Sequence, residues 1–382
     1  MTRRILHLTR DFPPRHAGGI STALGGLLAA ASALEDGPRH AVISFDGWRP
    51  NRGPTTSARV EPPASADTPL PILHAEGPAD LDAARAFAAA LQPDVVHVHH
   101  ALLFDALPDL FPTAAPPVLL TLHVLQFHLS RLRGLDAPTL SDQAEMRALA
   151  SARAISTPTE AARQILLDAA PQLADRVFVT PLGVSPLPHS AALDECNRYF
   201  FNSIEIDGQA PATTLVYIGR FDALKGLPEL ISALPSIVAA HPETRVIIAG
   251  GIPENPKADR RWRRRLAHLS DAGVVLLPWL STPEVAQLLS IATHFIAPSH
   301  AETCGLTLME ARAAGLHLIA SDLAAHREVA PEATFFAAGD HEALTRATLT
   351  ALAADTATPP RAAPTSPRWS DVLPDWVHFW AK

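Results

Sequence analysis

The segment that decides the fold is HFIAPSHAETCGLTLMEARAAG, residues 294–315. Its first six residues form a short apolar run that is typical of a buried strand. The stretch after the loop has the spacing of a helix, which Gly315 ends as the residue after the C-cap. A strand, a loop and a helix in this order are the repeating unit of a parallel sheet covered by helices. Ligands of such sheets bind outside the carboxyl ends of the strands, so we expect the loop to face a ligand.

Two carboxylates, Glu302 and Glu310, stand in this segment eight positions apart. A charged side chain beside an apolar run is costly unless something pairs with it. Glu302 lies on the loop, and Glu310 lies two turns into the helix and slants back toward its N-terminus. An anion site is expected from the free backbone N–H groups around Cys304, Gly305, Leu306 and Thr307. A nucleoside diphosphate sugar brings both the phosphates and the hydroxyl donors that this arrangement suits. The alternative is a helix that is merely acidic on its solvated face.

The same alternation of elements recurs along the whole chain. Strands are predicted in the first half at 4–9, 40–45, 94–99 and 117–123, and in the second half at 213–219, 244–251, 274–278, 294–299 and 317–322. Helices are predicted at about 21–34, 80–91 and 141–152, the last with Ser141 as its N-cap. The turn-rich stretch 181–211 interrupts the pattern. We therefore predict an α/β fold of two doubly wound Rossmann-like domains facing a cleft, an N-terminal domain of residues 1–185 and a C-terminal domain of residues 186–365.

The chain ends in WSDVLPDWVHFWAK, whose apolar residues recur at helical spacing: Trp369, Val372, Leu373, Trp376 and Trp380. Pro374 is expected near the start of this helix, because a proline inside a helix removes a hydrogen bond. We expect the helix, within residues 366–382, to pack back on the N-terminal domain rather than to anchor at a membrane surface.

Composition excludes several classes of protein. Of the 382 residues 47% are hydrophobic and 18% charged, and the net charge of -8 argues against a nucleic-acid binder. Two cysteines, Cys196 and Cys304, provide no disulfide framework and fit a reducing compartment. No stretch reaches the ~18 apolar residues of a membrane span, and the N-terminal apolar run is too short for a signal sequence. We expect a cytoplasmic protein whose membrane association is at most peripheral.

Two further motifs lie where strands end. IGRFDALKG, residues 218–226, places Arg220 and Lys225 at a carboxyl edge, where fixed positive charge neutralises a diphosphate. In RHAGGIS, Gly18 and Gly19 let the backbone approach a ligand before the first helix. Taken singly, these motifs are more often a solvated basic face and an ordinary turn. Their joint occurrence at strand ends, in the expected order, is much harder to obtain by chance.

With these motifs the chain resembles the retaining glycosyltransferases of family 4, which have the two-Rossmann-domain GT-B fold. The resemblance is carried by GGIS, PDVVHVH, TLH, GRFDALKG and above all APSHAETCGLTLMEARAAG, which matches the family's Glu-x7-Glu signature. It implies that Glu302 contacts hydroxyls of the donor sugar, that Glu310 binds the ribose, and that Arg220 and Lys225 hold the diphosphate. It also implies that the Gly19 loop and the amides of residues 305–307 face the donor.

His123, in LLTLHVLQF, matches a family histidine that ends a strand beside the transferred sugar; the alternative is a buried structural histidine. Val124 departs from the family pattern, in which aspartate is common. His97 and His99, in HVHH, share one face of a strand, which raises the question of a metal site. No carboxylate or cysteine stands near them to complete a ligand set, and the family needs no metal ion. We therefore expect no metal or other cofactor, and polar residues that line the cleft.

The predicted function is retaining transfer of a sugar from a nucleoside diphosphate sugar to a hydroxyl of a carbohydrate, glycolipid or small-molecule acceptor. The predicted catalytic residues are His123, Arg220, Lys225 and Glu302, with the departing phosphate taking the acceptor proton. Two alternatives remain: a nucleotide-sugar epimerase with the same architecture, and a non-catalytic binding protein derived from a transferase.

Overall fold

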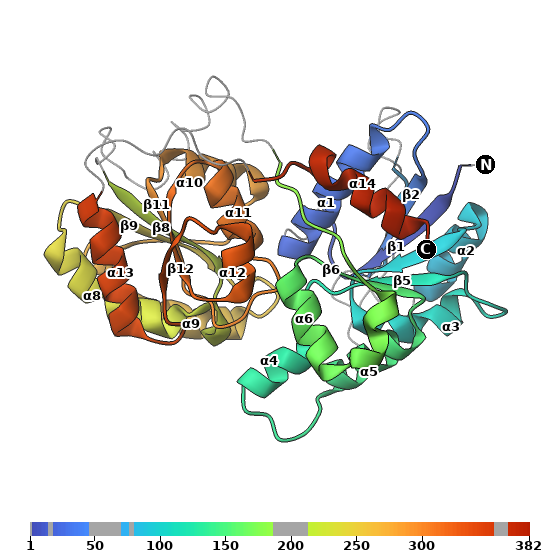
Figure 1. Ribbon diagram of the computed structural model, residues 1–382, viewed down its shortest axis with the longest axis horizontal. Helices are drawn as coiled ribbons and strands as arrows, with labels where there is room; N and C mark the ends of the chain where they lie inside the picture. The colour runs from blue at the N-terminus through green and yellow to red at the C-terminus, as the bar shows by residue number, and fades with distance from the viewer. Residues whose placement is uncertain (1, 14–17, 46–69, 76–79, 186–212, 355–365) are drawn as a thin grey trace. The chain divides into compact units, whose positions relative to one another are not determined.

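The computed structural model describes residues 2–13, 18–45, 70–75, 80–185, 213–354 and 366–382 (Figure 1). The chain forms two compact units. The first comprises Met1–Gly183 together with Pro367–Lys382, and the second comprises Val184–Ser366. Each unit has its own parallel sheet, as the alternation of strands and helices predicts, so the α/β prediction with two Rossmann-like sheets is confirmed.

The sheet of the first unit has seven parallel strands in the order β3-β2-β1-β4-β5-β6-β7. The strands are β1 Arg4–Thr9, β2 Arg39–Phe45, β3 Ile72–Ala75, β4 Val95–Val98, β5 Val118–Thr121, β6 Ala154–Thr157 and β7 Val177–Val179. The strand order reverses between β1 and β4. Doubly wound sheets bind ligands outside the carboxyl ends of the strands, beside a reversal of this kind.

Helices cover both faces of the first sheet: α1 Gly19–Ser32, α2 Leu81–Leu91, α3 Leu107–Leu110, α4 Gln126–Leu132, α5 Leu140–Ser151, α6 Glu160–Ala169 and α14 Trp369–Trp380. Leu6 and Leu8 point into an apolar core that includes residues of α2 and α5. His7, between them in β1, points to the opposite face, where α14 lies beside α1 (Figure 1).

Two local predictions about helix starts are wrong. Helix α1 begins at Gly19 rather than at Ser21, and Gly18 is its N-cap. The N-cap of α5 is Thr139 rather than Ser141: the Thr139 hydroxyl accepts from the Asp142 amide, and the Asp142 carboxylate accepts from the Thr139 amide. This reciprocal capping box satisfies two backbone donors at once, which explains why the helix begins before Ser141.

The C-terminal helix α14 packs within the first unit. The indole N–H of Trp376 donates to the Pro181 carbonyl at 2.9 Å. Pro374 is the sixth residue of the helix, not near its start as predicted. The proline lies on the exposed face, and the carbonyl that loses its donor belongs to Ser370, which is also exposed. Packing of the apolar face therefore maintains the helix despite the proline.

The sheet of the second unit has six parallel strands in the order β10-β9-β8-β11-β12-β13. The strands are β8 Thr214–Arg220, β9 Arg245–Gly251, β10 Val275–Leu277, β11 His294–Ala297, β12 His317–Ser321 and β13 Thr334–Phe336. The order repeats that of the first six strands of the other sheet. Its reversal lies between β8 and β11, so the two segments with charged motifs follow neighbouring strands.

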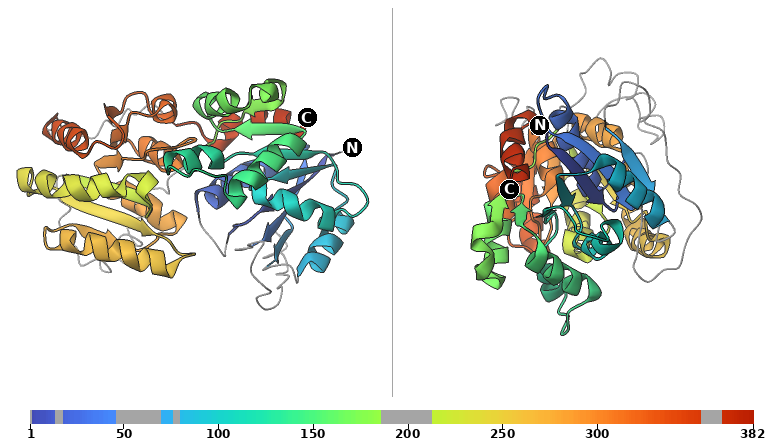
Figure 2. Two further views of the ribbon diagram at one scale, coloured as in Figure 1. Left: turned by 90° about the horizontal axis from the view of Figure 1, so that it is seen from below. Right: turned by 90° about the vertical axis from the view of Figure 1, so that its right-hand side faces the viewer.

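The helices of the second unit are α8 Leu227–Ala240, α9 Pro256–Ser270, α10 Thr282–Ile291, α11 Leu306–Ala313, α12 Ala324–Val329 and α13 His341–Ala354. They lie on both faces of the sheet (Figure 2). Leu215 and Tyr217 of β8 belong to one apolar core, and Val216 between them belongs to another. Burial on both faces explains why these strands read as continuous apolar runs. Among the helices of the described residues, none is both long and apolar enough to cross a bilayer.

Candidate active site

The predicted donor-binding residues of the second unit lie at or beyond the carboxyl ends of β8 and β11, which are neighbours in the second sheet. Arg220 is the last residue of β8, and a short 3-10 helix, Ala223–Lys225, follows it. The loop with Glu302 follows β11 and leads into α11. The structure thus brings Arg220, Lys225 and Glu302 to the place where the strand order reverses.

Gly226 lets the loop that carries Lys225 touch the chain that follows β11. Its φ is +70°, in the left-handed region, and an added Cβ would lie 1.9 Å from the carbonyl oxygen of Pro298. Beside this contact, the backbone N–H of His300 donates to the carbonyl of Leu224 at 2.8 Å. Only glycine permits both the backbone conformation and the close approach. Gly226 was not among the predicted site residues, although a glycine directly after a basic strand-end motif is a signal that could have found it.

Lys225 and Glu302 form an ion pair, with the Lys225 Nζ 2.6 Å from the Glu302 Oε1. The Ser299 hydroxyl donates to the same carboxylate oxygen at 2.9 Å. Burial opposes ionisation of Glu302, but the positive charge of Lys225, the nearby His326 and these hydrogen bonds together lower its pKa below the usual value. Glu302 is therefore ionised at neutral pH.

Arg220 also has a carboxylate partner, Glu254, in the segment between β9 and α9. Both side chains of this ion pair are well exposed to solvent. An exposed ion pair contributes little to stability, so a diphosphate can displace Glu254 from the guanidinium at small cost. Glu254 lies outside the motifs that the sequence singled out, and no pattern in its surroundings distinguishes it.

Helix α11 begins at Leu306, with Gly305 as its N-cap in the left-handed region, at a φ of +90°. The first-turn amides, including those of Leu306 and Thr307, have no carbonyl partner within the helix, and free amides of this kind are suited to an anion. The side chain of Cys304 points away from this end: it is buried, with its Sγ 3.3 Å from the Met309 Sδ. Burial raises the pKa of the thiol, so only the backbone of Cys304 is suited to contact a ligand.

Glu310 has a partly buried carboxylate in the second turn of α11. Burial raises its pKa to about 7. No residue in the described part of the chain donates a hydrogen bond to the carboxylate or forms an ion pair with it. A desolvated acceptor without protein donors is suited to a ligand that supplies hydroxyl groups.

Neither glycine of the first unit has an unusual backbone conformation, and only Gly19 has open space beside it. Gly18 has an extended φ of −101°. A Cβ on Gly19, the first residue of α1, would meet nothing within 4 Å. The open space beside Gly19 fits close approach by a ligand, whereas a special conformation is not required there. Contact of Gly18 and Gly19 with a donor stays a prediction.

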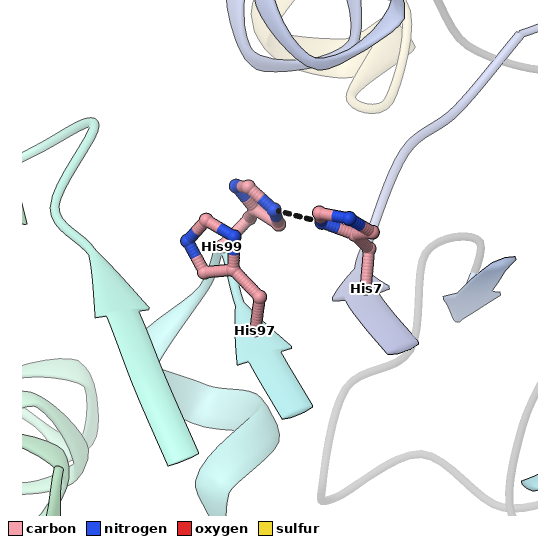
Figure 3. Close-up of side chains that lie close together, drawn as sticks. All are labelled: His7, His97 and His99. Atoms are coloured by element: carbon pink, nitrogen blue, oxygen red, sulfur yellow. Dashed lines mark hydrogen bonds between the residues drawn. The ribbon is translucent and has the colours of Figure 1, made fainter. Parts of the chain in front are cut away.

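His123 lies two residues beyond the end of β5, and its Nε2 is 3.1 Å from the Nδ1 of His99. Burial lowers the pKa of His123 to about 4, so the ring is neutral at pH 7. His97 and His99 lie beside a third histidine, His7 of β1, which was not among the predicted site residues (Figure 3). A signal was available, because His7 and His97 take the same register once β1 and β4 pair.

Comparison with known proteins decides the family. A family model described as "Glycosyltransferase Family 4" matches residues 17–186, and one described as "Glycosyl transferases group 1" matches residues 212–354. The chain belongs to glycosyltransferase family 4. The predicted family and enzyme class are thereby confirmed, and this family 4 enzyme is a hexosyltransferase that uses a nucleotide-sugar donor.

Among its relatives is the alpha-maltose-1-phosphate synthase of Mycolicibacterium smegmatis, 26% identical over 85% of this chain and 81% of the relative. A second is the GDP-mannose:cellobiosyl-diphosphopolyprenol alpha-mannosyltransferase of Xanthomonas campestris, 30% identical over 60% of this chain and 56% of the relative. The names of these two relatives indicate different sugars and acceptors.

Solved structures confirm the GT-B fold of the family 4 enzyme. A sucrose-phosphate synthase from Thermosynechococcus elongatus aligns with a TM-score of 0.72 at 20% identity, covering 98% of this chain and 94% of the other. The Anabaena HepE structure in complex with UDP and glucose aligns with a TM-score of 0.71 at 16% identity, covering 99% of both chains.

Proposed function

We propose that the family 4 enzyme is a retaining transferase that moves a hexose from a nucleoside diphosphate sugar to a hydroxyl of a carbohydrate, glycolipid or small-molecule acceptor, without a metal ion or other cofactor. The observation that carries this proposal is Glu310. Its carboxylate is desolvated and lacks donors from the described residues, and it belongs to the helix whose N-terminus offers free amides. A vicinal diol attached to a diphosphate, as in a ribose, suits both features.

The positive charge required for the diphosphate comes from two side chains and one helix end. Arg220 exchanges its exposed partner Glu254 for phosphate oxygens, and Lys225 and the first turn of α11 provide the remaining donors. Negative charge grows on the diphosphate as the bond to the sugar breaks. These groups stabilise the transition state because they are already oriented before the reaction.

Glu302 is suited to bind sugar hydroxyls rather than to donate a proton. Its lowered pKa keeps it ionised at neutral pH, with Lys225 on one oxygen. A glycosidase needs two carboxyl groups that flank the bond that breaks, one of them protonated and the other ionised. An ionised Glu302 held by a lysine supports a different route, in which the departing phosphate takes the proton of the acceptor hydroxyl on the same face of the sugar.

Nucleotide binding tests the donor site. Thermal unfolding is followed for the wild type and for Glu310→Ala with UDP, GDP, ADP, dTDP and CMP. A ligand at about a hundred times its Kd stabilises the folded state by about 2.7 kcal/mol. We expect one diphosphate to raise the wild-type midpoint and to lose this effect in the variant. Equal shifts of the unfolding midpoint in both proteins would show that Glu310 does not contact the nucleotide. No shift with any nucleotide would contradict the donor site.

Product analysis tests the reaction. The nucleotide that binds is supplied as its hexose conjugates with a panel of acceptors, and NMR reads the anomeric configuration of the product. Retention of the donor configuration is expected. Inversion would contradict the proposed mechanism, and conversion of the nucleotide sugar without an acceptor would favour an epimerase.

A further inference from the structure

One face of the first sheet carries a continuous layer of polar side chains in place of an apolar core. The paired registers place its members on the same face of β2, β1, β4, β5 and β6 and their extensions. We call these residues the polar layer: His7, His40, His97, His99, Thr121, His123 and Ser156. The aromatic side chains of α14 cover it, with the indole of Trp380 packed against His40 at a centroid distance of 4.6 Å.

Four members of the polar layer are joined end to end. The Nδ1 of His40 lies 2.9 Å from the Nε2 of His7. The Nδ1 of His7 lies 3.1 Å from the Nε2 of His99, the contact that is dashed in Figure 3. The Nδ1 of His99 then lies 3.1 Å from the Nε2 of His123. We call this series, from His40 to His123, the histidine chain. It links the strand β2 to the predicted sugar-contacting histidine.

A metal site is the first alternative, because ring nitrogens of His7, His97 and His99 lie within 4.8 Å of one another. However, both nitrogens of His97 have other partners. The indole N–H of Trp380 donates to its Nδ1 at 3.1 Å, and its Nε2 lies 2.7 Å from the Thr121 hydroxyl. A metal ion bound by His97 would have to displace one of these partners, and displacing Trp380 would leave a buried indole N–H unpaired, which is costly.

The rings of the histidine chain are neutral at pH 7. Burial lowers the pKa of His40 and of His123 to about 4. Burial also lowers the pKa values of His7 and His99 well below the usual value, and neighbouring histidines add to the effect. A neutral imidazole has one N–H and one acceptor nitrogen, so each link of the chain holds a single proton. The tautomer of one ring therefore fixes the tautomers of the neighbouring rings.

His40, at the buried end of the histidine chain, determines in which direction the hydrogen bonds of the chain run. The Nε2 of His40 is buried and has no hydrogen-bond partner in the described part of the molecule. In one direction this atom carries an unpaired N–H, and in the other it carries only a lone pair. An unpaired buried N–H is the rarer of the two. The proton of His40 therefore resides on Nδ1, and every ring along the chain donates from its Nδ1.

We propose that His40, His7 and His99 are positioning residues that lock His123 in one tautomer, with Nε2 accepting from His99 and the proton on Nδ1. His123 is then a hydrogen-bond donor toward a hydroxyl oxygen of the transferred sugar, and it is not a general base. The contact with the sugar rests on the proposed function. The tautomer does not, because it follows from hydrogen bonds within the first unit.

The tautomer is measured without any substrate. The full-length protein is labelled with 15N-histidine, and two-bond 1H–15N correlations at pH 7.5 identify which nitrogen of each ring is protonated. The His123→Gln variant identifies the signals of His123. We expect the proton of His123 on Nδ1. A proton on Nε2 would overturn the proposal, whether or not the protein transfers a sugar.

Two substitutions at His99 separate positioning from packing. Asn keeps an N–H donor near the place of Nδ1, whereas Leu fills the space without a donor. In His99→Leu we expect His123 to move toward the Nε2–H form and kcat to fall about tenfold, the loss of one hydrogen bond in the transition state. In His99→Asn we expect the His123 tautomer and kcat to stay near wild type. In the Leu and the Asn variants alike, we expect the KM for the donor to change less than about twofold.

The outcomes have distinct meanings. An unchanged His123 tautomer in His99→Leu would overturn the lock, and a changed tautomer with unchanged kcat would overturn the positioning role. Equal losses of kcat in the Asn and Leu variants would indicate a structural role and also contradict the proposal. Absence of transfer by the wild type with every donor would contradict the proposed function, while the NMR result would still decide the tautomer.

Discussion

At the scale of single residues, the site consists of acids and bases whose charge depends on partners distant in the sequence. Glu302 and Glu310 share one motif and yet have opposite properties. Lys225, 77 residues away, helps to keep Glu302 ionised, while burial without any such partner raises the pKa of Glu310 to about 7. The motif therefore contains one carboxylate that is charged at neutral pH and one that titrates there.

We expect nucleotide binding to depend on pH through Glu310. If the ribose hydroxyls donate to the carboxylate, binding favours its ionised form and lowers its pKa in the complex. The Kd of the nucleotide is then expected to rise as pH falls from 8 to 6, by up to about tenfold per pH unit below 7. Isothermal titration calorimetry of the wild type and of Glu310→Gln checks this. The nucleotide titrates alike in both, so an equal pH dependence in the two proteins would rule out Glu310 as its source.

Lys225→Ala is expected to reduce kcat by about a hundredfold, because a fixed charge beside the leaving diphosphate is lost. Nucleotide affinity is expected to fall much less, since Arg220 and the α11 amides remain. The variant also leaves Glu302 without its main partner, so the double variant Lys225→Ala/Glu302→Gln serves as a control for stability. Steady-state kinetics measures kcat, and calorimetry measures the nucleotide affinity. Equal losses in the two would contradict a role of Lys225 in the transition state.

At the scale of secondary structure, local sequence patterns predict most elements, but caps and tertiary packing determine where some of them begin and end. The sequence predicts most of the strands and several of the helices to within a few residues, because burial on both faces gives apolar runs and the helices have amphipathic spacing, but it misses β3 and β13. It fails at the N-cap of α5 and at Pro374 in α14, where a reciprocal side-chain contact and tertiary packing override the local preference. The packing of α14 involves residues distant in the sequence, which a local pattern does not contain, whereas the capping box lies within Thr139 to Asp142 and its spacing was available as a local signal.

Gly226→Ala tests the turn that brings Lys225 to Glu302. A left-handed residue with a Cβ costs about 1–2 kcal/mol, and the clash with the Pro298 carbonyl adds to this. We expect a loss of more than about 2 kcal/mol in the free energy of unfolding of the second unit. Gly19→Ala is the matched control, because its Cβ would meet open space, and a change within about 0.5 kcal/mol is expected. Urea unfolding measures both, and similar effects in the two variants would refute the steric argument.

At the scale of the whole molecule, the polar layer makes the fold sensitive to acid. Its five histidines bind protons in the unfolded chain below about pH 6.5 but not in the folded state, where burial lowers their pKa values. The contribution of these histidines to the free energy of unfolding is therefore complete above pH 6.5 and is lost as pH falls toward 4. The loss is about 1.4 kcal/mol per pH unit for each proton that the unfolded chain binds in excess of the folded state. Glu145 and Glu310 act in the opposite direction, because burial raises their pKa values to about 7, but they are outnumbered.

Urea unfolding between pH 7.5 and 5 measures this effect. Tryptophan fluorescence is a suitable probe, because Trp376 and Trp380 lie against the polar layer. We expect the free energy of unfolding of the first unit to fall by several kcal/mol over this range. A constant or rising stability toward pH 5 would show that the layer is not neutral in the folded protein.

Much of this protein follows from its sequence alone. The alternation of apolar strands with amphipathic helices specifies two parallel α/β sheets, and the glycine and charge motifs at strand ends specify the family, because each depends on residues close together in the chain. Only the tertiary structure decided that Lys225 pairs with Glu302, that Arg220 pairs with Glu254, and that four histidines from separate strands form one chain. The physical reason is that strand order and burial determine partners and pKa values, and both arise only when distant segments pack together.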